Sequence, residues 1–208
     1  ASFLARHRPR SARGSSRQAW GRRLLALAGL VVMAGLELVS HMREASPLAK
    51  GPVEIRYAPA SDLERIDLAL LGSATRSIDM AAYLVTDALL IEALADAARR
   101  GVRVRLYLDG AEEASGPGFG GRARGLRGAR GIEVRLKPPG SEIMHLKSYC
   151  VDGQVLRSGS ANFTVWGLKR EDDDLVVIRE ASAIAAFERT FDTIWRRAEN
   201  FSEAVGRP

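Results

Sequence analysis

The sequence has very few of the side chains that build disulfides and metal centres: one cysteine and three histidines in 208 residues. The single cysteine, Cys150, excludes an internal disulfide and a multi-cysteine zinc site. No segment repeats with a period of roughly 20 to 50 residues, which argues against solenoid and propeller folds. With 46% hydrophobic residues, the chain is suited to one core-forming domain with an appendage.

Acidic residues are absent from the first 36 positions, and this absence explains the net charge of +6. Residues 1–50 hold nine Lys/Arg and two Glu, a charge of +7. Residues 51–208 hold the other 22 basic and 23 acidic residues, a charge of −1. The globular part is therefore close to neutral, and its overall charge gives no argument for binding to nucleic acid.

A basic arm and an apolar run make up residues 1–46. Thirteen apolar residues fill positions 24–36, and the segment continues through Glu37 to residue 39. A basic flank before an apolar run is typical of a secretory signal peptide or a signal anchor. Because no small-residue cleavage site follows, we favour an uncleaved anchor over a removed signal peptide. The run is short for a full span, which needs about 20 residues.

We expect residues 24–39 to contact a membrane, with the basic arm on the cytoplasmic side and the domain exported. This places the domain in a bacterial periplasm, anchored at the inner membrane. An arginine-rich arm without acids also fits organelle targeting, so a mitochondrial membrane is the alternative. Residues 47–52 form a linker, and the globular domain covers residues 53–208.

Strand and helix patterns alternate after the linker. Segment 102–109 alternates apolar residues with arginine, which is typical of a strand. Segment 87–101 begins with Asp and ends with Arg-Arg-Gly, which is typical of a helix. The same patterns predict strands at 53–59, 77–85, 132–137 and 174–180, and helices at 62–74 and 182–200. This order predicts an α/β fold in which helices sandwich a mixed β-sheet.

One predicted hairpin carries polar side chains in register. Asp152-Gly153 lies between two β-prone runs, which indicates a hairpin with a two-residue loop. That loop places Lys147 opposite Ser158 and His145 opposite Ser160. All four side chains are expected on one face of the hairpin, because strand residues alternate between faces.

The side chains on this face suit phosphate chemistry. A neutral imidazole is a nucleophile at physiological pH, a lysine beside it binds a phosphoryl oxygen, and hydroxyl and amide groups stabilise the developing charge. Asn162 joins the set if the strand continues, and Gly159 removes a side chain where another group must approach closely. Such a site needs neither a metal nor another cofactor. Taken alone, His145 and Lys147 also fit a solvated polar face, and Asp152 fits a plain turn residue.

The residues from His145 to Asn162 spell HxKx4Dx6GSxN without a departure. This pattern resembles the signature of the phospholipase D superfamily, known as the HKD motif, and the resemblance extends over residues 53 to about 200. It is similar in particular to small single-motif members, the group of the bacterial endonuclease Nuc and mitochondrial phospholipase D. The resemblance implies a phospholipase D/nuclease-like fold with one motif per chain, and a catalytic domain at 53–208.

The resemblance also implies a role for each motif residue. Family members attack phosphorus with the motif histidine, form a phosphohistidine and use no metal. A second motif histidine protonates the leaving group, so a single-motif chain is implied to form a homodimer that pairs two His145 residues. One His145 is then the nucleophile and the other the general acid and base. Three residues are implied to bind the phosphate: Lys147, Ser160 and Asn162. Two are implied to be structural: Asp152 and Gly159.

One catalytic position departs from the family pattern. The family has Glu in a Glu-Asn pair before the last strand, where it supports the histidine, whereas this chain has Asp173 and Asp174. Aspartate is one methylene shorter, so Asp173 is expected to be catalytic only if it reaches His145. A solvated acidic turn at 171–174 is the alternative. The zinc-binding insertion of animal mitochondrial relatives needs several cysteines, and its absence favours a bacterial-type protein.

The motif fits both nucleic acid and phospholipid as the substrate. Between Arg99 and Lys137, ten Lys/Arg stand against four acids, most densely at 118–131. This segment fits either a loop or helix that follows a nucleic-acid backbone or a solvated helix face. Few aromatic residues lie near it, so base stacking has weak support.

Three hypotheses follow from these patterns. The first is a phosphodiester hydrolase that is a metal-independent, non-specific endonuclease acting through a phosphohistidine. The second is a phospholipase D that hydrolyses a membrane phospholipid such as cardiolipin. The third is a membrane-tethered nucleic-acid-binding protein with weak catalysis, because Asp173 replaces the glutamate.

Overall fold

The computed structural model describes residues 51–114, 123–140 and 142–200. The strands are β1 (Val53–Tyr57), β2 (Ser77–Ala82), β3 (Arg103–Asp109), β4 (Ile132–Lys137), β5 (Lys147–Val151), β6 (Val155–Ser158) and β7 (Asp174–Ile178). The helices are α2 (Leu63–Gly72), α3 (Ala88–Arg99), α4 (Gly110–Ala114), the 3₁₀ helix η1 (Ala123–Leu126), α5 (Val165–Lys169) and α6 (Ala181–Trp195). Every strand expected from the sequence is present.

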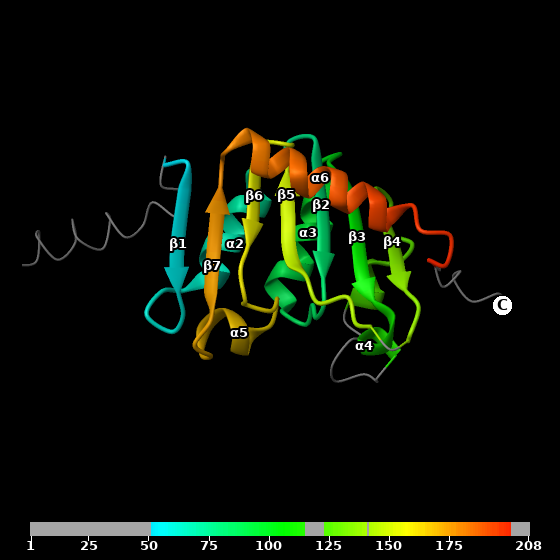
Figure 1. Cartoon of the computed structure of the whole chain (residues 1–208), viewed down its shortest axis with the longest axis horizontal. Helices are drawn as coiled ribbons and strands as arrows, with labels where there is room; N and C mark the ends of the chain where they lie inside the picture. The colour runs from blue at the N-terminus through cyan, green and yellow to red at the C-terminus, as the bar shows by residue number, and fades with distance from the viewer. Residues whose placement is uncertain (1–50, 115–122, 141, 201–208) are drawn as a thin grey trace, which may run out of the picture. The chain divides into compact units, whose positions relative to one another are not determined.

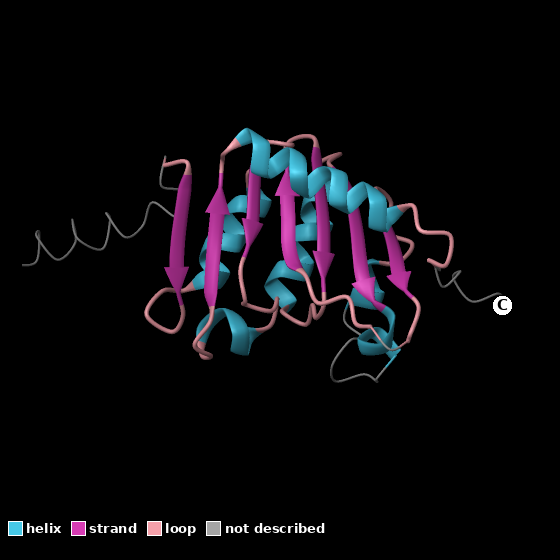
Figure 2. Ribbon diagram, in the orientation of Figure 1, coloured by secondary structure: helices cyan, strands magenta, loops and turns pink. Residues whose placement is uncertain are grey.

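The strands form one seven-stranded sheet in the order β1-β7-β6-β5-β2-β3-β4. Strands β2, β3 and β4 are parallel, whereas each pair from β1 through β7, β6 and β5 to β2 is antiparallel. Helix α6 crosses one face of the sheet, and α2 and α3 cover the other (Figure 1, Figure 2). The predicted α/β fold, with helices on both sides of a mixed sheet, is confirmed.

Apolar side chains fill the space on both faces of the sheet. The larger cluster joins α2 and α3 to the sheet and includes Leu63, Leu70, Leu90, Leu94, Ile78, Met80, Val104 and Leu106. The cluster beneath α6 includes Tyr107, Phe191 and Trp195. Burial of each such side chain stabilises the fold by roughly 1.5 to 3 kcal/mol, so the two layers together fix the sheet between its helices.

Carboxylate and amide side chains set the ends of the main helices. Asp62 accepts a hydrogen bond from the Arg65 amide, and Asp87 accepts from the amides of Leu89 and Leu90, which starts α2 and α3 where the sequence predicted. Helix α6 ends at Trp195, before the predicted end at residue 200. The Asn200 amide donates to the Ile194 and Trp195 carbonyls, which provides partners for the last turn.

Three short helices, α4, η1 and α5, were not predicted, because each is too short to show a helical period. The basic segment 118–131 is described only from residue 123, where η1 begins. The arm at 1–46 and the proposed membrane segment 24–39 lie outside the described residues. Among the residues that the structure describes, none of the helices combines the length and the hydrophobicity that a membrane span requires.

The hairpin forms at Asp152-Gly153, but its predicted register is wrong by one residue. Val151 pairs with Val155, not with Gln154. Asp152 and Gly153 both have positive φ angles, 56° and 64°, and the Gln154 amide donates to the Val151 carbonyl at 2.9 Å. The turn closes there, and Gln154 is left as an extra residue before the ladder resumes.

This shift changes which serines face the lysine strand. Ser158 contacts Ser148, with 3.0 Å between their Oγ atoms, and so lies on the opposite face from Lys147. The strand ladder ends before His145 and Ser160, so these two do not pair in a ladder as the sequence suggested. Any proximity between them comes from loops at the sheet edge.

Strand directions bring the motif to one edge of the sheet. Strands β2 and β6 end at this edge, and β5 and β7 begin there, at the lower side of Figure 1. The loops at this edge are joined by backbone hydrogen bonds: Tyr83 donates to the Leu146 carbonyl at 2.8 Å, and Thr86 and Asp87 donate to the Phe163 carbonyl at 3.0 Å. Segments far apart in the sequence therefore meet where a site can form.

Candidate active site

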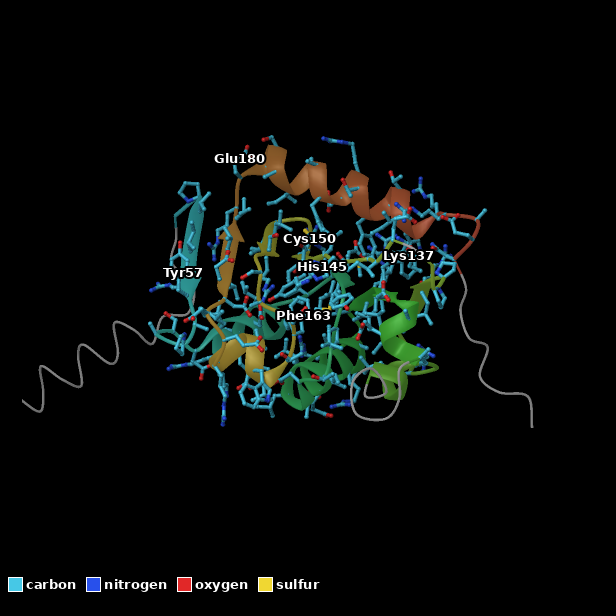
Figure 3. The ribbon with its side chains drawn as sticks, turned by 60° about the horizontal axis from the view of Figure 1, so that its bottom comes forward. Tyr57, Lys137, His145, Cys150, Phe163 and Glu180 are labelled. Atoms are coloured by element: carbon cyan, nitrogen blue, oxygen red, sulfur yellow. The ribbon has the colours of Figure 1, made fainter. Side chains whose placement is uncertain are left out.

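Residues from both halves of the motif lie at this edge. His145 precedes β5, Lys147 is its first residue, Ser160 and Asn162 follow β6, and Asp173 directly precedes β7. Figure 3 turns the edge toward the viewer, with His145 near the centre of the domain and Phe163 close by in the view. The segment before His145 is anchored by Asp109, whose carboxylate accepts the Met144 amide at 2.7 Å.

Ser160 and Asp173 are joined directly. The Ser160 hydroxyl donates to Asp173 Oδ1 at 2.7 Å and accepts the Asp174 amide at 2.9 Å, while the Ser160 amide donates to Asp174 Oδ1 at 3.0 Å. Three hydrogen bonds thus hold the loop after β6 against the start of β7. Asp173 reaches the motif through Ser160, and the described part of the chain has no hydrogen bond between Asp173 and His145.

Lys147 interacts with the backbone of the histidine and with the charge of this carboxylate. The residue is 6% exposed, and Nζ donates to the His145 carbonyl at 3.0 Å. Burial lowers the pKa of Lys147, and the negative charge of Asp173 acts in the opposite direction. A buried ammonium with one carbonyl partner retains donors for a phosphate oxygen.

The ring of Tyr83 packs against the histidine, a contact that no pattern in the sequence predicted. The ring centroids of Tyr83 and His145 are 4.7 Å apart, and Lys147 Nζ lies 4.9 Å from the centre of the Tyr83 ring. Tyr83 donates to Glu112 on α4 at 2.7 Å, and this hydrogen bond raises the pKa of Tyr83 to about 12. The one available signal was the position of Tyr83 directly after a buried strand.

Two glycines permit close approach of backbone segments at the site, Gly159 at Asp174 and Gly167 at Asn162. A Cβ on Gly159, whose φ is 134°, would lie 2.4 Å from the Asp174 carbonyl oxygen. A Cβ on Gly167 would lie 2.9 Å from the Asn162 carbonyl oxygen and 3.3 Å from Asp173 Oδ2, so Asn162 and Asp173 are neighbours. Gly159 was predicted to serve this purpose, whereas Gly167 was not. Asn162 Oδ1 is buried and has no hydrogen-bond partner within the described ranges.

Asp152 lies away from these residues, in the turn at the other end of β5. Its carboxylate accepts hydrogen bonds from the amides of Thr75, Arg76 and Ser77 and from the Thr75 hydroxyl, at 2.7 to 2.9 Å. Partial burial acts to raise the pKa of Asp152, but these hydrogen bonds outweigh it and lower the pKa to about 2. The contacts are those of a residue that joins the hairpin to the loop before β2.

The site can therefore offer an exposed imidazole, a buried ammonium, and a hydroxyl and an amide beside a carboxylate. Among the described residues, no cluster of three or more His, Cys, Asp or Glu side chains is placed to hold a metal ion. These groups can carry out nucleophilic attack on phosphorus and neutralise the charge of a phosphate.

Comparisons with known proteins agree with this chemistry. Residues 68–195 match the family described as "Cardiolipin synthase, PLD-like domain". The chain is 30% identical over 198 residues to the mitochondrial cardiolipin hydrolase of Xenopus laevis, covering 85% of this chain and 90% of that protein. It is 31% identical over 142 residues to that of Chlamydomonas reinhardtii, covering 68% of this chain and 60% of that protein.

A solved structure matches as well. The phospholipase D family member Nuc from Salmonella typhimurium superposes with a TM-score of 0.65 at 26% identity, covering 73% of this chain and 98% of that chain. The family match includes every motif residue from His145 to Asn162, together with Asp173. The chain therefore belongs to the phospholipase D superfamily, as a phosphodiester hydrolase of its PLD-like domain family.

Proposed function

We propose that this hydrolase is a metal-independent endonuclease without strong sequence preference, acting through a phosphohistidine on His145. The observation that best supports this is the group of side chains at this edge: Tyr83 packs against His145, Lys147 donates to the His145 carbonyl, the charge of Asp173 acts on Lys147, and Ser160 donates to Asp173. It surrounds an exposed imidazole with groups that bind and neutralise a phosphate.

In the first step, an imidazole nitrogen of His145 attacks phosphorus, so that a P–N bond forms and the bond to the leaving oxygen breaks. The leaving oxygen takes a proton from the partner subunit's His145. That histidine, now neutral, takes a proton from water, and the resulting hydroxide attacks phosphorus and breaks the P–N bond. Lys147 and Asn162 donate to the non-bridging oxygens throughout.

This mechanism requires two histidines, so we propose a homodimer with two His145 side chains across a twofold axis. The exposure of Ile143 (53%) and Leu146 (38%), which flank His145, supports a second copy at this edge. If each site needs both histidines, random mixing of equal amounts of wild type and His145→Asn should leave about a quarter of the activity. Retention of half would contradict the shared site.

The function is tested with the full chain in mild detergent and EDTA, as wild type and His145→Asn. Single-stranded DNA, RNA and duplex DNA are offered at several salt concentrations. Cleavage by wild type alone, at rates that fall with salt, is the expected result. Salt-sensitive binding without cleavage would favour the third hypothesis, a binding protein with weak catalysis.

Phospholipid hydrolysis is the second candidate, and a specific observation favours it. Exposed apolar side chains gather on the loops and helix starts at the site edge: Leu89 (54%), Val165 (44%) and Trp166 (61%). Trp166 also has the guanidinium of Arg170 5.1 Å from its ring centre, a pairing suited to a lipid surface. Release of phosphatidate from cardiolipin vesicles, with nucleic acid left intact, would establish this function instead.

We further propose that residues 24–39 hold the domain at a membrane, in the bacterial periplasm at the inner membrane. The names of the mitochondrial relatives support a mitochondrial membrane as the alternative. Fractionation of cells that express the tagged full chain, with protease added to either side of the membrane, distinguishes these locations.

A further inference from the structure

A fully buried ion pair lies next to the motif, inside the domain. The side chains of Arg157 on β6 and Asp67 on α2 are both 0% exposed. Arg157 Nε donates to Asp67 Oδ1 at 3.0 Å and Nη2 donates to Oδ2 at 3.1 Å, while the Tyr149 hydroxyl donates to Oδ1 at 2.8 Å. Because two parallel hydrogen bonds orient the guanidinium, its remaining donors point in fixed directions.

Those remaining donors bind both halves of the motif. Arg157 Nη1 donates to the Lys147 carbonyl at 2.9 Å and to the Ala161 carbonyl at 3.2 Å. Lys147 belongs to the His-x-Lys half, and Ala161 belongs to the Gly-Ser-x-Asn half. One nitrogen atom therefore joins two segments that the strand ladder does not join.

The end of the ladder explains why this link is needed. Pairing between β5 and β6 stops at Tyr149 and Arg157, and past this point Gly159 lies tightly against the backbone at the start of β7. Lys147 points its carbonyl toward the β6 side, since the preceding Leu146 carbonyl already accepts the Tyr83 amide on the β2 side. Without Arg157, the Lys147 carbonyl would be buried without a donor.

Stability alone does not account for this pair. Buried ion pairs can usually be replaced by apolar residues of similar size without loss of stability, because desolvation offsets the attraction. An apolar side chain at Arg157 could fill the space beside Phe163, but it could not donate to two carbonyls. The distinctive property of Arg157 is the geometry that it imposes.

We propose that Arg157 is a positioning residue, which fixes the spacing of Lys147 and Asn162 and thereby the place of a phosphate relative to His145. Asn162 is bonded to Ala161, and Lys147 itself donates to the His145 carbonyl, so a shift at either carbonyl moves the binding groups. The inference rests on the proposed phosphodiesterase function. Misplacement of reacting groups by about 1 Å can reduce a rate by about 10²-fold.

The first test compares Arg157→Met with Arg105→Met in the full chain. Arg105 also pairs with a largely buried carboxylate, Asp79, at 2.7 Å, but its contacts lie with Asp192 and the α6 aromatic cluster. With bis(p-nitrophenyl) phosphate as the probe, we expect Arg157→Met to lower kcat on the order of 100-fold and to change KM less than threefold. Arg105→Met should leave kcat within about twofold of wild type.

A second variant guards against misfolding of Arg157→Met, which leaves Asp67 unpaired. The triple variant Asp67→Leu, Tyr149→Phe, Arg157→Met removes every charge and donor of the network and is expected to fold. If its melting temperature is at or above that of wild type and kcat still falls, the loss comes from positioning. If kcat and KM equal those of wild type, the proposal is overturned.

The imidazole signals of His145 provide a readout that does not depend on turnover. They are assigned in spectra of histidine-labelled protein by their absence in His145→Asn. The triple variant should shift these signals, and Arg105→Met should not. Unchanged signals would overturn the inference. If wild type hydrolyses no substrate, the proposed function fails, while the shifts still decide whether Arg157 positions His145.

Discussion

The Ser160 hydroxyl donates its hydrogen to Asp173 at 2.7 Å and accepts the Asp174 amide at 2.9 Å. The hydroxyl hydrogen is therefore not directed at a substrate. In this arrangement Ser160 joins the Asp173 carboxylate to the motif loop, and in the proposed mechanism phosphate binding falls mainly to Lys147 and Asn162. Direct donation from Ser160 to phosphate requires the hydroxyl to rotate away from Asp173.

Asp173→Asn should lower kcat by about 10- to 100-fold, because it removes the negative charge near Lys147 and weakens the acceptor for Ser160. Hydrolysis of bis(p-nitrophenyl) phosphate in EDTA measures the effect. Asp172→Asn is the matched control, since Asp172 is exposed and adjacent, and its rate should stay within about twofold of wild type. Equal rates for the two variants would show that Asp173 belongs to a solvated turn.

Two substitutions at Tyr83 separate its ring from its hydroxyl. Tyr83→Phe keeps the ring beside His145 and loses only the hydrogen bond to Glu112, so we expect kcat/KM within about threefold of wild type. Tyr83→Ala removes the surface against which the imidazole packs, and we expect a loss of at least about tenfold. If the phenylalanine variant loses as much as the alanine variant, the hydroxyl is the important group.

Gly159→Ala should destabilise the protein by at least about 2 kcal/mol, because the new Cβ would meet the Asp174 carbonyl at 2.4 Å on a backbone with φ of 134°. Gly72→Ala is the control, since no atom outside the backbone of its own helix and its chain neighbours lies within 4 Å of its Cβ position, and it ends α2. We expect that variant to be neutral or up to about 1 kcal/mol more stable. Urea unfolding of both variants measures the difference.

The hydrogen bonds of Asp152 predict a pH-dependent contribution to stability. The pKa of about 2 in the folded protein is lower than the ordinary value of 3.8, so the contribution is complete above about pH 5 and is lost as the pH falls from about 4 through 2. At pH 7, Asp152→Asn should lower the free energy of unfolding by about 1 kcal/mol, after allowance for solvent screening. The difference from wild type should disappear near pH 2.

Denaturant unfolding at several pH values measures this contribution. Asp172→Asn, with an exposed carboxylate at another turn, should differ from wild type by a small and constant amount over the same range. A difference at Asp152 that persists unchanged below pH 2 would mean that the loss comes from the different hydrogen-bonding groups of the amide and not from the charge of the carboxylate.

Local sequence signals predicted the strands, the three longer helices and the position of the motif hairpin, but not the register of that hairpin. Asp62 and Asp87 marked the helix starts because capping depends on residues two or three positions away. Asp152-Gly153 marked the turn, but the register depended on Gln154, whose place in the ladder is set by the turn's closing hydrogen bond. The Asp152-Gly153 dipeptide alone does not indicate that Gln154 lies outside the ladder.

Local sequence patterns could not predict contacts between segments that are far apart in the sequence. Tyr83 meets His145 and Glu112 only because the sheet order places β2 beside β5 and α4 after β3. Arg157 resembled a solvent-facing strand residue, because arginine is rarely buried without a partner. Its partner Asp67 lies 90 positions earlier, on a different element.

The hydrogen-bond network around Arg157 also affects which fragment of the chain can fold on its own. The family match starts at residue 68, one position after Asp67, and leaves out β1. A fragment cut to residues 68–195 would enclose a cationic side chain without its anion and would expose the edge of β7 that β1 normally covers. Such a fragment should aggregate although it keeps every motif residue. We therefore expect that a fragment able to fold on its own begins before residue 68, where the family match starts, and includes β1.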